Sequence, residues 1–264
     1  MKRLPIALTI AGSDSGGGAG IQADLKTFAA LRTHGTSALT CMTAQTPAGV
    51  VAVHPSPAGF VRSQLETLTA HLPPAAAKTG MLFNARIVHA VADWAERNRA
   101  IPLVVDPVMI ATSGARLLRP DAMRAVRERL LPLATVLTPN LDEAAALLGR
   151  PLSSLEDLRL AARAIHGTWG VPVLVKGGHL RKLARATDVF WDGRTEKLLS
   201  APFVRGVSTH GTGCTYSAAI AAHLALGRAL PAAVAAAKRF ITASIAGSVA
   251  VAGHTALDPL HGRR

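Results

Sequence analysis

Short apolar runs bounded by turn residues alternate with longer stretches of helical spacing along most of the chain. Apolar runs of this kind are typical of strands buried on both faces, and the stretches between them predict amphipathic helices. The expected strands are Pro5–Ala11, Thr36–Thr43, Ala76–Gly80, Pro102–Asp106, Thr135–Pro139 and Pro172–Lys176. The expected helices are Ala19–Leu31, Pro57–His71, Asn84–Arg99, Pro120–Leu131, Leu141–Gly149 and Ser153–Gly170.

The last third of the chain follows a different pattern. Thr187–Trp191 and Glu196–Ala201 predict an edge hairpin, and two Ala-rich helices follow at about Gly211–Leu226 and Pro231–Ala252. Alternation of strands and helices predicts an α/β fold with a mostly parallel sheet between two helical layers. No Gly/Ser/Pro-rich linker and no repeat divides the chain, so we expect a single domain over residues 1–264. Ligands of such folds gather beyond the carboxyl ends of the strands.

The net positive charge raises the possibility of a nucleic-acid partner, but the distribution of the charged residues does not support one. The 264 residues include 29 Lys and Arg against 16 Asp and Glu, a net charge of +13. Nucleic-acid binders concentrate such charge on one face or in a tail. Here it is scattered through the expected helices, and no long basic run occurs. We therefore expect no nucleic acid as partner, although a basic background favours the approach of nucleotides and phosphate esters.

Cysteine usage and hydropathy indicate a cytoplasmic protein. Only Cys41 and Cys214 occur, which implies no disulfide framework and a reducing compartment. The apolar N-terminal run contains Pro5 and lacks a small-residue cleavage site, so it is interpreted as a strand and not as a signal peptide. Charged residues interrupt the Ala-rich C-terminal region, so we expect no membrane span.

A glycine-rich segment, Gly12-Ser13-Asp14-Ser15-Gly16-Gly17-Gly18-Ala19-Gly20, joins the first expected strand to the first helix. It does not fit the Walker pattern, because Gly18 stands where a Lys is needed. It does not fit the dinucleotide pattern, because Ile21 replaces the last Gly. A plain strand–helix turn stays open, but this many glycines favour a loop that closely covers a ligand.

A second motif, Gly211-Thr212-Gly213-Cys214, opens the first Ala-rich helix. Consecutive N–H groups at a helix start, together with the helix dipole, form an anion hole for phosphate oxygens. Cys214 lies in the first turn, where the same field favours the thiolate. A small buried thiol packed against a glycine turn is the alternative, and the flanking glycines favour the anion hole.

Polar residues at the ends of three further strands suit phosphate and metal binding. Asn140 can cap the helix whose first turn contains Glu143, and capping alone would explain this pair. Together with Asp106, Glu143 supplies carboxylates suited to a hydrated Mg²⁺. Lys176, followed by two glycines, combines a cation with flexible backbone, as a phosphate grip requires.

These motifs together resemble the ribokinase-like kinases. Most sugar kinases of that group have an Asp general base where this chain has Cys214, which is similar to pyrimidine kinases and some pyridoxal kinases. The nearest resemblance is to the hydroxymethylpyrimidine/phosphomethylpyrimidine kinases of thiamine biosynthesis. Matching segments follow in order along nearly the whole chain: Thr9–Asp14, Gly17–Lys26, Thr43–Gln45, Lys78–Met81, Val105–Met109, Thr138–Asn140 and Val175–His179. The chain departs from the family pattern at Ser15-Gly16 and at Thr46-Pro47-Ala48-Gly49.

The resemblance implies a ribokinase-like three-layer αβα sandwich, usually a homodimer, with two successive reactions in one pocket. ATP would phosphorylate 4-amino-5-hydroxymethyl-2-methylpyrimidine to its monophosphate, and a second ATP would form the diphosphate, with Mg²⁺ as cofactor. The implied substrate contacts are Gln45, Gly12, Asp24, Met81 and Val108. The implied ATP contacts are Lys176, Thr209 and Asn140, and the implied metal contacts are Glu143 and Asp106. The implied anion hole is Gly211, Thr212, Gly213 and Cys214, with Cys214 as the catalytic base.

Other functions stay open. A pyridoxal or pyridoxine kinase is the first alternative, because Gln45 and an anion hole containing Cys fit both rings. A sugar kinase is disfavoured, because it would have an Asp at position 214. A non-catalytic ligand sensor could have kept the pocket, and a nucleic-acid binder would show a steep salt dependence of its affinity.

Overall fold

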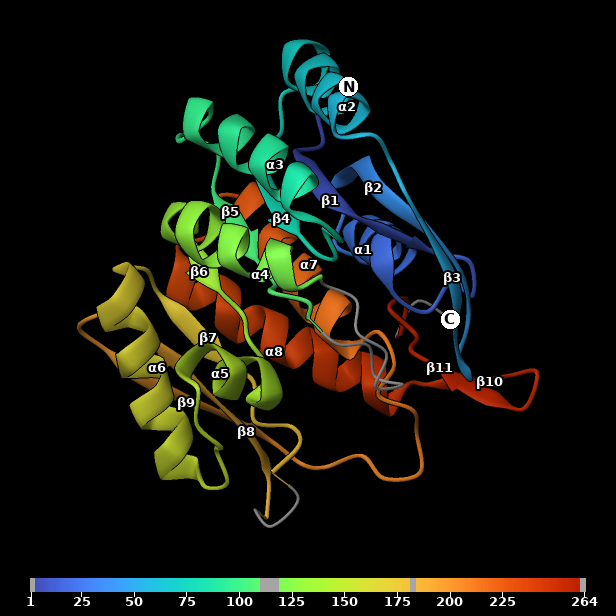
Figure 1. Cartoon of the computed structure of the whole chain (residues 1–264). Helices are drawn as coiled ribbons and strands as arrows, with labels where there is room; N and C mark the ends of the chain where they lie inside the picture. The colour runs from blue at the N-terminus through green and yellow to red at the C-terminus, as the bar shows by residue number, and fades with distance from the viewer. Residues whose placement is uncertain (1–2, 110–118, 181–183, 262–264) are drawn as a thin grey trace.

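A nine-stranded sheet forms the centre of the computed structural model, which describes residues 3–109, 119–180 and 184–261 (Figure 1). Within these residues the strand order is β3-β2-β1-β4-β5-β6-β7-β8-β9. The strands are β1 (Ile6–Asp14), β2 (His34–Thr46), β3 (Gly49–Pro55), β4 (Ala76–Thr79), β5 (Leu103–Val105), β6 (Val136–Leu137), β7 (Val173–Val175), β8 (Ala186–Trp191) and β9 (Glu196–Ala201). Strands β2, β1, β4, β5, β6 and β7 are parallel, and the antiparallel strands β3, β8 and β9 lie at the edges.

Helices cover both faces of the sheet, as the alternating pattern predicts (Figure 1). They are α1 (Gly20–Ala30), α2 (Ala58–His71), α3 (Ala85–Arg97), α4 (Pro120–Ala125), α5 (Leu141–Leu148), α6 (Leu155–Trp169), α7 (Thr212–Ala225) and α8 (Leu230–Ala246). One apolar core contains Phe28, Tyr216 and Val234 from α1, α7 and α8. The other contains residues from α2 to α6, such as Leu65 and Trp94. The expected three-layer αβα sandwich is therefore confirmed.

Three stretches differ from the expected elements. Strand β3 was not expected; it pairs antiparallel with β2 across the turn at Thr46 and Gly49. Helix α8 ends at Ala246, not Ala252, because Gly247 ends it and the β-branched residues that follow form a small hairpin. That hairpin pairs β10 (Val249–Val251) with β11 (His254–Ala256). The expected helix Pro120–Leu131 is α4 followed by a π-helical turn and a 3₁₀ turn containing Pro132.

The chain order of the strands creates a crevice at the carboxyl end of β1. From β1 the chain moves outward to β2 and β3, and then returns to β4 on the other side of β1. At such a reversal the connections leave the sheet in opposite directions, and ligands bind in the gap between them. Gly12, near the end of β1, and Met81, just after β4, lie at this gap.

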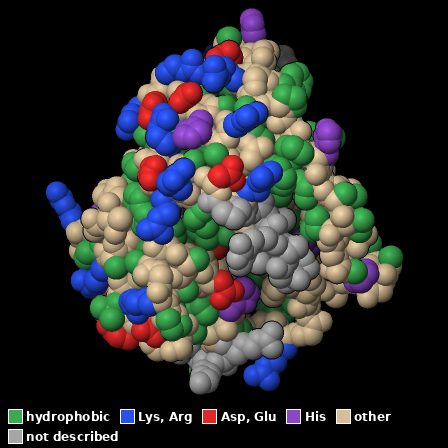
Figure 2. All heavy atoms as spheres, in the orientation of Figure 1, with side chains coloured by type: hydrophobic (Ala, Val, Ile, Leu, Met, Phe, Trp, Pro, Cys, Tyr) green, Lys and Arg blue, Asp and Glu red, His purple; other side chains and the backbone are tan. Residues whose placement is uncertain are grey.

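Charges of opposite sign alternate on the face that Figure 2 shows, where Lys and Arg lie among Asp and Glu. On α2 and α3, Arg62 is 3.7 Å from Asp93, and Arg97 is 3.4 Å from Glu66. Arg129 contacts Asp93 at 3.0 Å. Much of the positive charge here is therefore ion-paired. In the described ranges, none of the helices has both the length and the apolar character to cross a bilayer.

Candidate active site

A cavity of about 280 Å³ lies at the carboxyl ends of the central strands. Its walls come from both halves of the chain, from the loop after β1 to helix α8. The residues expected at the site that line it are Gly12, Gln45, Met81, Asp106, Val108, Asn140, Glu143, Lys176, Thr209, Gly211, Thr212, Gly213 and Cys214. The structure thus brings together nearly all of the residues that the sequence motifs singled out.

Asp24 is the exception among the expected substrate contacts. Its side chain is fully buried on the inner face of α1, where Thr9 Oγ1 donates a hydrogen bond to it at 2.6 Å. Lys78 Nζ, equally buried, is 3.0 Å from Asp24 Oδ2. Asp24 lies behind the wall of the cavity and is not among its lining residues. The expected direct contact with substrate is therefore wrong.

The anion-hole motif begins helix α7 in the expected way. Gly211 has a left-handed backbone with φ of 80°, and a Cβ there would collide with the carbonyl oxygen of Gly18. Only glycine allows the glycine loop and the helix start to pack so closely. A Cβ on Gly213 would lie 3.4 Å from Lys176 Nζ. The helix start therefore presents its N–H groups beside a cation, as an anion site requires.

The acidity of Cys214 differs from the expectation. Burial raises the pKa of the Cys214 thiol to about 11, against the opposing effect of Lys78. A backbone hydrogen bond from Gly20 also lowers this pKa, whereas Asp24 and Asp106 raise it. The helix start alone does not produce a thiolate at neutral pH. Burial, together with the carboxylates of Asp24 and Asp106, keeps the thiol protonated even though it lies in the first turn of a helix.

Lys176 and Asp106 form a buried ion pair at the floor of the cavity. Lys176 Nζ is 2.9 Å from Asp106 Oδ1, and Ser217 Oγ donates to Asp106 Oδ2 at 3.0 Å. Burial acts to raise the pKa of Asp106, but the ammonium groups of Lys176 and Lys78 outweigh it and hold this pKa below its usual value. Burial acts to lower the pKa of Lys176, and the carboxylates of Asp106 and Glu143 outweigh it and raise that pKa. Lys176 stays charged at neutral pH.

Glu143 combines the capping role with an unusual acidity. Its backbone N–H donates to Asn140 Oδ1 at 2.9 Å, and its carboxylate accepts the Asn140 N–H at 2.8 Å. Burial, aided by Asp106, raises the pKa of Glu143 to about 7 although Lys176 opposes the shift. No group of three or more His, Cys, Asp or Glu suited to a metal occurs among the described residues. Two carboxylates fit a Mg²⁺ that keeps most of its ligands as water and phosphate.

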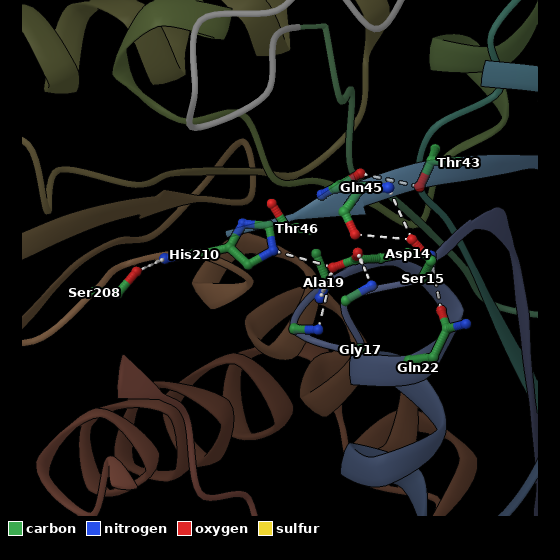
Figure 3. A network of polar contacts seen from close by, with 12 residues as sticks. Asp14, Ser15, Gly17, Ala19, Gln22, Thr43, Gln45, Thr46, Ser208 and His210 are labelled. Atoms are coloured by element: carbon green, nitrogen blue, oxygen red, sulfur yellow. Dashed lines mark hydrogen bonds and ion pairs between the residues drawn. The ribbon is translucent and has the colours of Figure 1, made fainter. Parts of the chain in front are cut away.

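The backbone of Gln45 is tied to the glycine loop (Figure 3). Ser15 Oγ accepts the Gln45 N–H and donates to the Gln45 carbonyl, both at 2.8 Å. Thr43 Oγ1 donates to Gln45 Oε1 at 3.2 Å, which turns the carbonyl of the amide toward Thr43. The residue expected to recognise the ring is thus positioned by contacts on two sides.

Asp14 organises the glycine loop from within (Figure 3). Its carboxylate accepts the N–H groups of Gly16, Gly18 and Ala19 at 2.8 to 3.1 Å, and His210 Nε2 is 3.1 Å away. Burial acts to raise the pKa of Asp14, but the His210 contact and the backbone donors outweigh it and lower this pKa. Asp14 lies in the glycine-rich sequence motif and His210 directly precedes the Gly211 motif, but neither was given a role. A carboxylate followed by a glycine-rich run of N–H donors was the available signal.

This arrangement of loops corresponds to a known family. The family model described as phosphomethylpyrimidine kinase matches residues 14–258. The chain belongs to the phosphomethylpyrimidine kinase family. It is 52% identical over 243 residues to a hydroxymethylpyrimidine/phosphomethylpyrimidine kinase of Rhizobium meliloti, covering 91% of this chain and 90% of that protein. It is 48% identical to the enzyme of the same description from Synechococcus elongatus, covering 94% of each chain.

A solved structure is also closely similar to this member of the family. The pyridoxal kinase of Bacillus subtilis in an ADP complex superposes with a TM-score of 0.92 at 41% identity. The match covers 99% of each chain. The fold is therefore shared by kinases described for a pyrimidine and for a pyridine substrate.

The sequence did not predict the apolar part of the cavity lining in this family member. Apolar side chains form it, from Phe203 and Val204 after β9 to Ile241 and Ile245 on α8. A buried ion pair lies in its wall, with Lys238 Nζ 2.7 Å from Asp188 Oδ2. In the sequence these positions look like ordinary helix and strand core. Only the packing of α8 against β8 and β9 places them on a cavity.

Proposed function

We propose that the chain phosphorylates 4-amino-5-hydroxymethyl-2-methylpyrimidine with ATP and then phosphorylates the monophosphate to the diphosphate, in thiamine biosynthesis. One observation carries the proposal: a single cavity joins a wall containing Gln45 to the helix start containing Cys214. An acceptor ring and a phosphate in transfer would therefore have sites within one cavity. The names of the relatives, at 48–52% identity over nearly the whole chain, support the same reaction.

The acceptor end would recognise the ring. The Gln45 amide offers a donor and an acceptor to an aminopyrimidine edge. Gly12, Met81 and Val108 would contact the ring faces, since all three line the cavity and Gly12 lies beside Met81. A Cβ on Gly12 would come within 2.6 Å of Cys41 Sγ, so glycine leaves room there.

The phosphate end would stabilise charge during the transfer. The N–H groups of Gly211 to Cys214 would accept the transferring phosphoryl oxygens, which is where negative charge develops. Lys176, beside Gly213, would neutralise the nucleotide phosphates together with Thr209 and Asn140. Cys214 would take the proton of the acceptor hydroxyl as general base in its thiolate form, which is a small fraction at neutral pH because its pKa is about 11. The apolar end at Phe203 and Ile245 would hold the nucleotide base.

Glu143 and Asp106 would hold Mg²⁺ beside the nucleotide phosphates, largely through water ligands of the ion. When bound, this ion would neutralise charge on the transferred phosphoryl group. Asp106 already binds Lys176 and Ser217, so Glu143 is the more available carboxylate. The pKa of Glu143 is about 7, so a nearby cation, which favours the charged carboxylate, would increase its ionised fraction at neutral pH.

We further propose a single domain over residues 1–264, a homodimer and a cytoplasmic location. One cavity drawing on both halves of the chain supports a single domain. Two free cysteines, Cys41 and Cys214, support a reducing compartment. Neither nucleic acid nor a membrane is proposed as partner, in keeping with the paired charges on α2 and α3.

The decisive experiment is a product assay with purified protein, ATP and Mg²⁺ on the pyrimidine alcohol, the pyrimidine monophosphate, pyridoxal and pyridoxine. The proposal expects both pyrimidine phosphates to form, and their absence with a folded protein would reject it. Pyridoxal kinase activity is the second candidate, favoured by the TM-score of 0.92 to the Bacillus subtilis pyridoxal kinase. Faster turnover of pyridoxal than of the pyrimidine alcohol would establish that alternative.

A further inference from the structure

Lys78 and Asp24 form an ion pair with no exposed surface. Both side chains are 0% exposed, with Nζ 3.0 and 3.2 Å from the two carboxylate oxygens. Neither residue lines the cavity. Burying two charges has a large desolvation cost, and apolar replacements of such pairs are often as stable as the original. Stability is therefore a weak explanation for an ion pair at this place. The residues around the pair indicate a different role.

The pair joins two elements that pack against α7, the helix whose first turn contains Cys214: Lys78 lies on β4 and Asp24 on α1. The N–H of Gly20, at the start of α1, hydrogen-bonds to Cys214, and Asp24 follows one helical turn later on the same helix. On the other side, a Cβ on Gly80 would lie 3.3 Å from Lys78 Nζ, and Gly80 lines the cavity. Lys78 thus lies just beneath the cavity wall, next to the helix turn that touches the thiol.

We propose that Lys78 is a positioning residue for Cys214: its ammonium is a fixed positive charge that stabilises the thiolate, and Asp24 limits that effect. The inference deepens the proposed function, since Cys214 is the proposed base. The charge effect on the sulfur does not itself depend on which substrate the enzyme uses.

Charged groups from four parts of the fold face the thiol. Lys78 comes from β4, Asp24 from α1, Asp106 from the loop after β5 and Lys176 from the end of β7. Lys78 is the strongest influence that lowers the pKa of Cys214, and Asp24 and Asp106 raise it. The two members of one ion pair therefore act on the thiol with opposite signs. A merely structural role would give both residues the same sign, because removing either one loosens the same packing.

The test measures the rate at which iodoacetamide alkylates Cys214 as a function of pH, in the full chain without ATP or substrate. Cys214 is partly exposed in the cavity and Cys41 is buried, so mass spectrometry of the two peptides separates their reactions. Because the pKa of Cys214 is about 11, the midpoint is obtained by extrapolating the rise of the rate between about pH 7 and pH 9, where the rate follows the thiolate fraction. Lys78→Met should move this midpoint to higher pH by about one unit, which lowers the alkylation rate at a fixed pH about tenfold. Asp24→Asn should move the alkylation midpoint to lower pH. In Lys78→Arg the midpoint should stay close to that of the unmodified protein.

Opposite shifts in Lys78→Met and Asp24→Asn support the inference, and any other pair of results overturns it. If either single variant does not fold, the double variant Lys78→Met/Asp24→Asn replaces it, because it removes both charges together. Its midpoint must then lie above that of Lys78→Arg, and a midpoint at or below it overturns the inference. Because alkylation needs no substrate, opposite shifts beside a failed product assay would reject the kinase proposal alone.

Discussion

The imidazole of His210 lies 3.1 Å from the carboxylate of Asp14 and joins two loops that are 196 residues apart in the chain. Asp14 holds the glycine loop beside Gln45, and His210 directly precedes the anion hole at Gly211. A Cβ on Gly18 would lie 2.6 Å from the His210 ring, so the two loops are in close contact here. This contact, together with the hydrogen bond from the Gly20 N–H to Cys214, therefore fixes the acceptor side of the cavity to its phosphate side.

His210→Ala should reduce both kinase activities by roughly 10-fold or more, because a hydrogen bond to a charged group contributes about 1.5–3 kcal/mol. His210→Gln should retain most of the activity, since its amide can still donate to Asp14. Steady-state assays of both phosphorylation steps compare the variants. Equal losses in the Ala and Gln variants would show that the imidazole has another role.

Gln45→Leu should lower the catalytic efficiency for the pyrimidine alcohol by an amount equivalent to roughly 1–3 kcal/mol, because the polar edge of the ring loses its partner. The value of kcat/KM measures the loss. Met42→Leu is a matched control on the same strand, exposed and outside the cavity lining. An unchanged efficiency in Gln45→Leu would remove Gln45 from the recognition of the ring.

Local features of the sequence were sufficient to predict that most of the candidate site residues lie together. Gly211 and Gly213 flank a helix start, and Lys176 ends a strand, so their places at one sheet edge follow from general rules of α/β folds. The strand–helix pattern likewise predicted the sandwich. These predictions succeeded because each depended on neighbours in the chain.

The sequence could not predict which side chains are buried, or which charges distant segments place next to them. Asp24 follows the glycine loop by only one helical turn, yet its side chain points to Lys78 and away from the cavity. The pKa of Cys214 depends on burial and on the charges of Lys78, Asp24 and Asp106, which come from separate segments, so the helix start alone could not predict it. The apolar end at Phe203 and Ile245 likewise required the packing of α8 against the sheet.

Glu143→Gln should reduce both activities at limiting Mg²⁺ and much less at saturating Mg²⁺. Gln can still serve in the capping box, so the free energy of unfolding should change by less than ~1 kcal/mol. Titration of activity with Mg²⁺ gives the comparison. Asp142→Asn is the control, because it changes an exposed carboxylate in the same turn. Normal activity of Glu143→Gln at limiting Mg²⁺ would leave Glu143 with the capping role alone.

His223 should make the protein sensitive to acid. It is 6% exposed on α7, and burial, reinforced by Arg228 and Arg239, lowers its pKa to about 4. Between that value and the ordinary pKa near 6.5, the unfolded chain binds a proton that the folded chain does not, so stability falls as the pH falls. Acidification from pH 7 to pH 4 should therefore remove on the order of 1–3 kcal/mol through this residue.

Urea unfolding at several pH values measures that loss. His223→Gln should weaken the dependence of stability on pH in this window, since Gln does not titrate. His254→Gln, at an exposed position on β11, is the matched control. An unchanged pH dependence in His223→Gln would place the acid sensitivity elsewhere in the protein.

Cys214 should matter for the first phosphoryl transfer far more than for the second. The hydroxymethyl group must lose a proton as the new P–O bond forms, so a positioned base accelerates its reaction. The phosphate of the monophosphate is already anionic near neutral pH and needs little deprotonation. The backbone N–H groups of Gly211 to Cys214 serve both acceptors, and they stay in place when the side chain is truncated.

Cys214→Ala should therefore cut the alcohol kinase activity by about 10²-fold or more and the monophosphate kinase activity far less. The pKa of about 11 adds a dependence on pH. Below pH 11 the thiolate fraction increases about tenfold per pH unit, so the alcohol activity of the unmodified enzyme should increase with pH relative to the monophosphate activity. In Cys214→Ala this relative increase should disappear. Both activities are measured on one folded preparation from about pH 6 to about pH 9. Over this range the thiolate fraction should increase roughly 1000-fold. Equal losses in the two activities would instead mean that Cys214 shapes the cavity or positions phosphate, because a missing base cannot slow both acceptors alike.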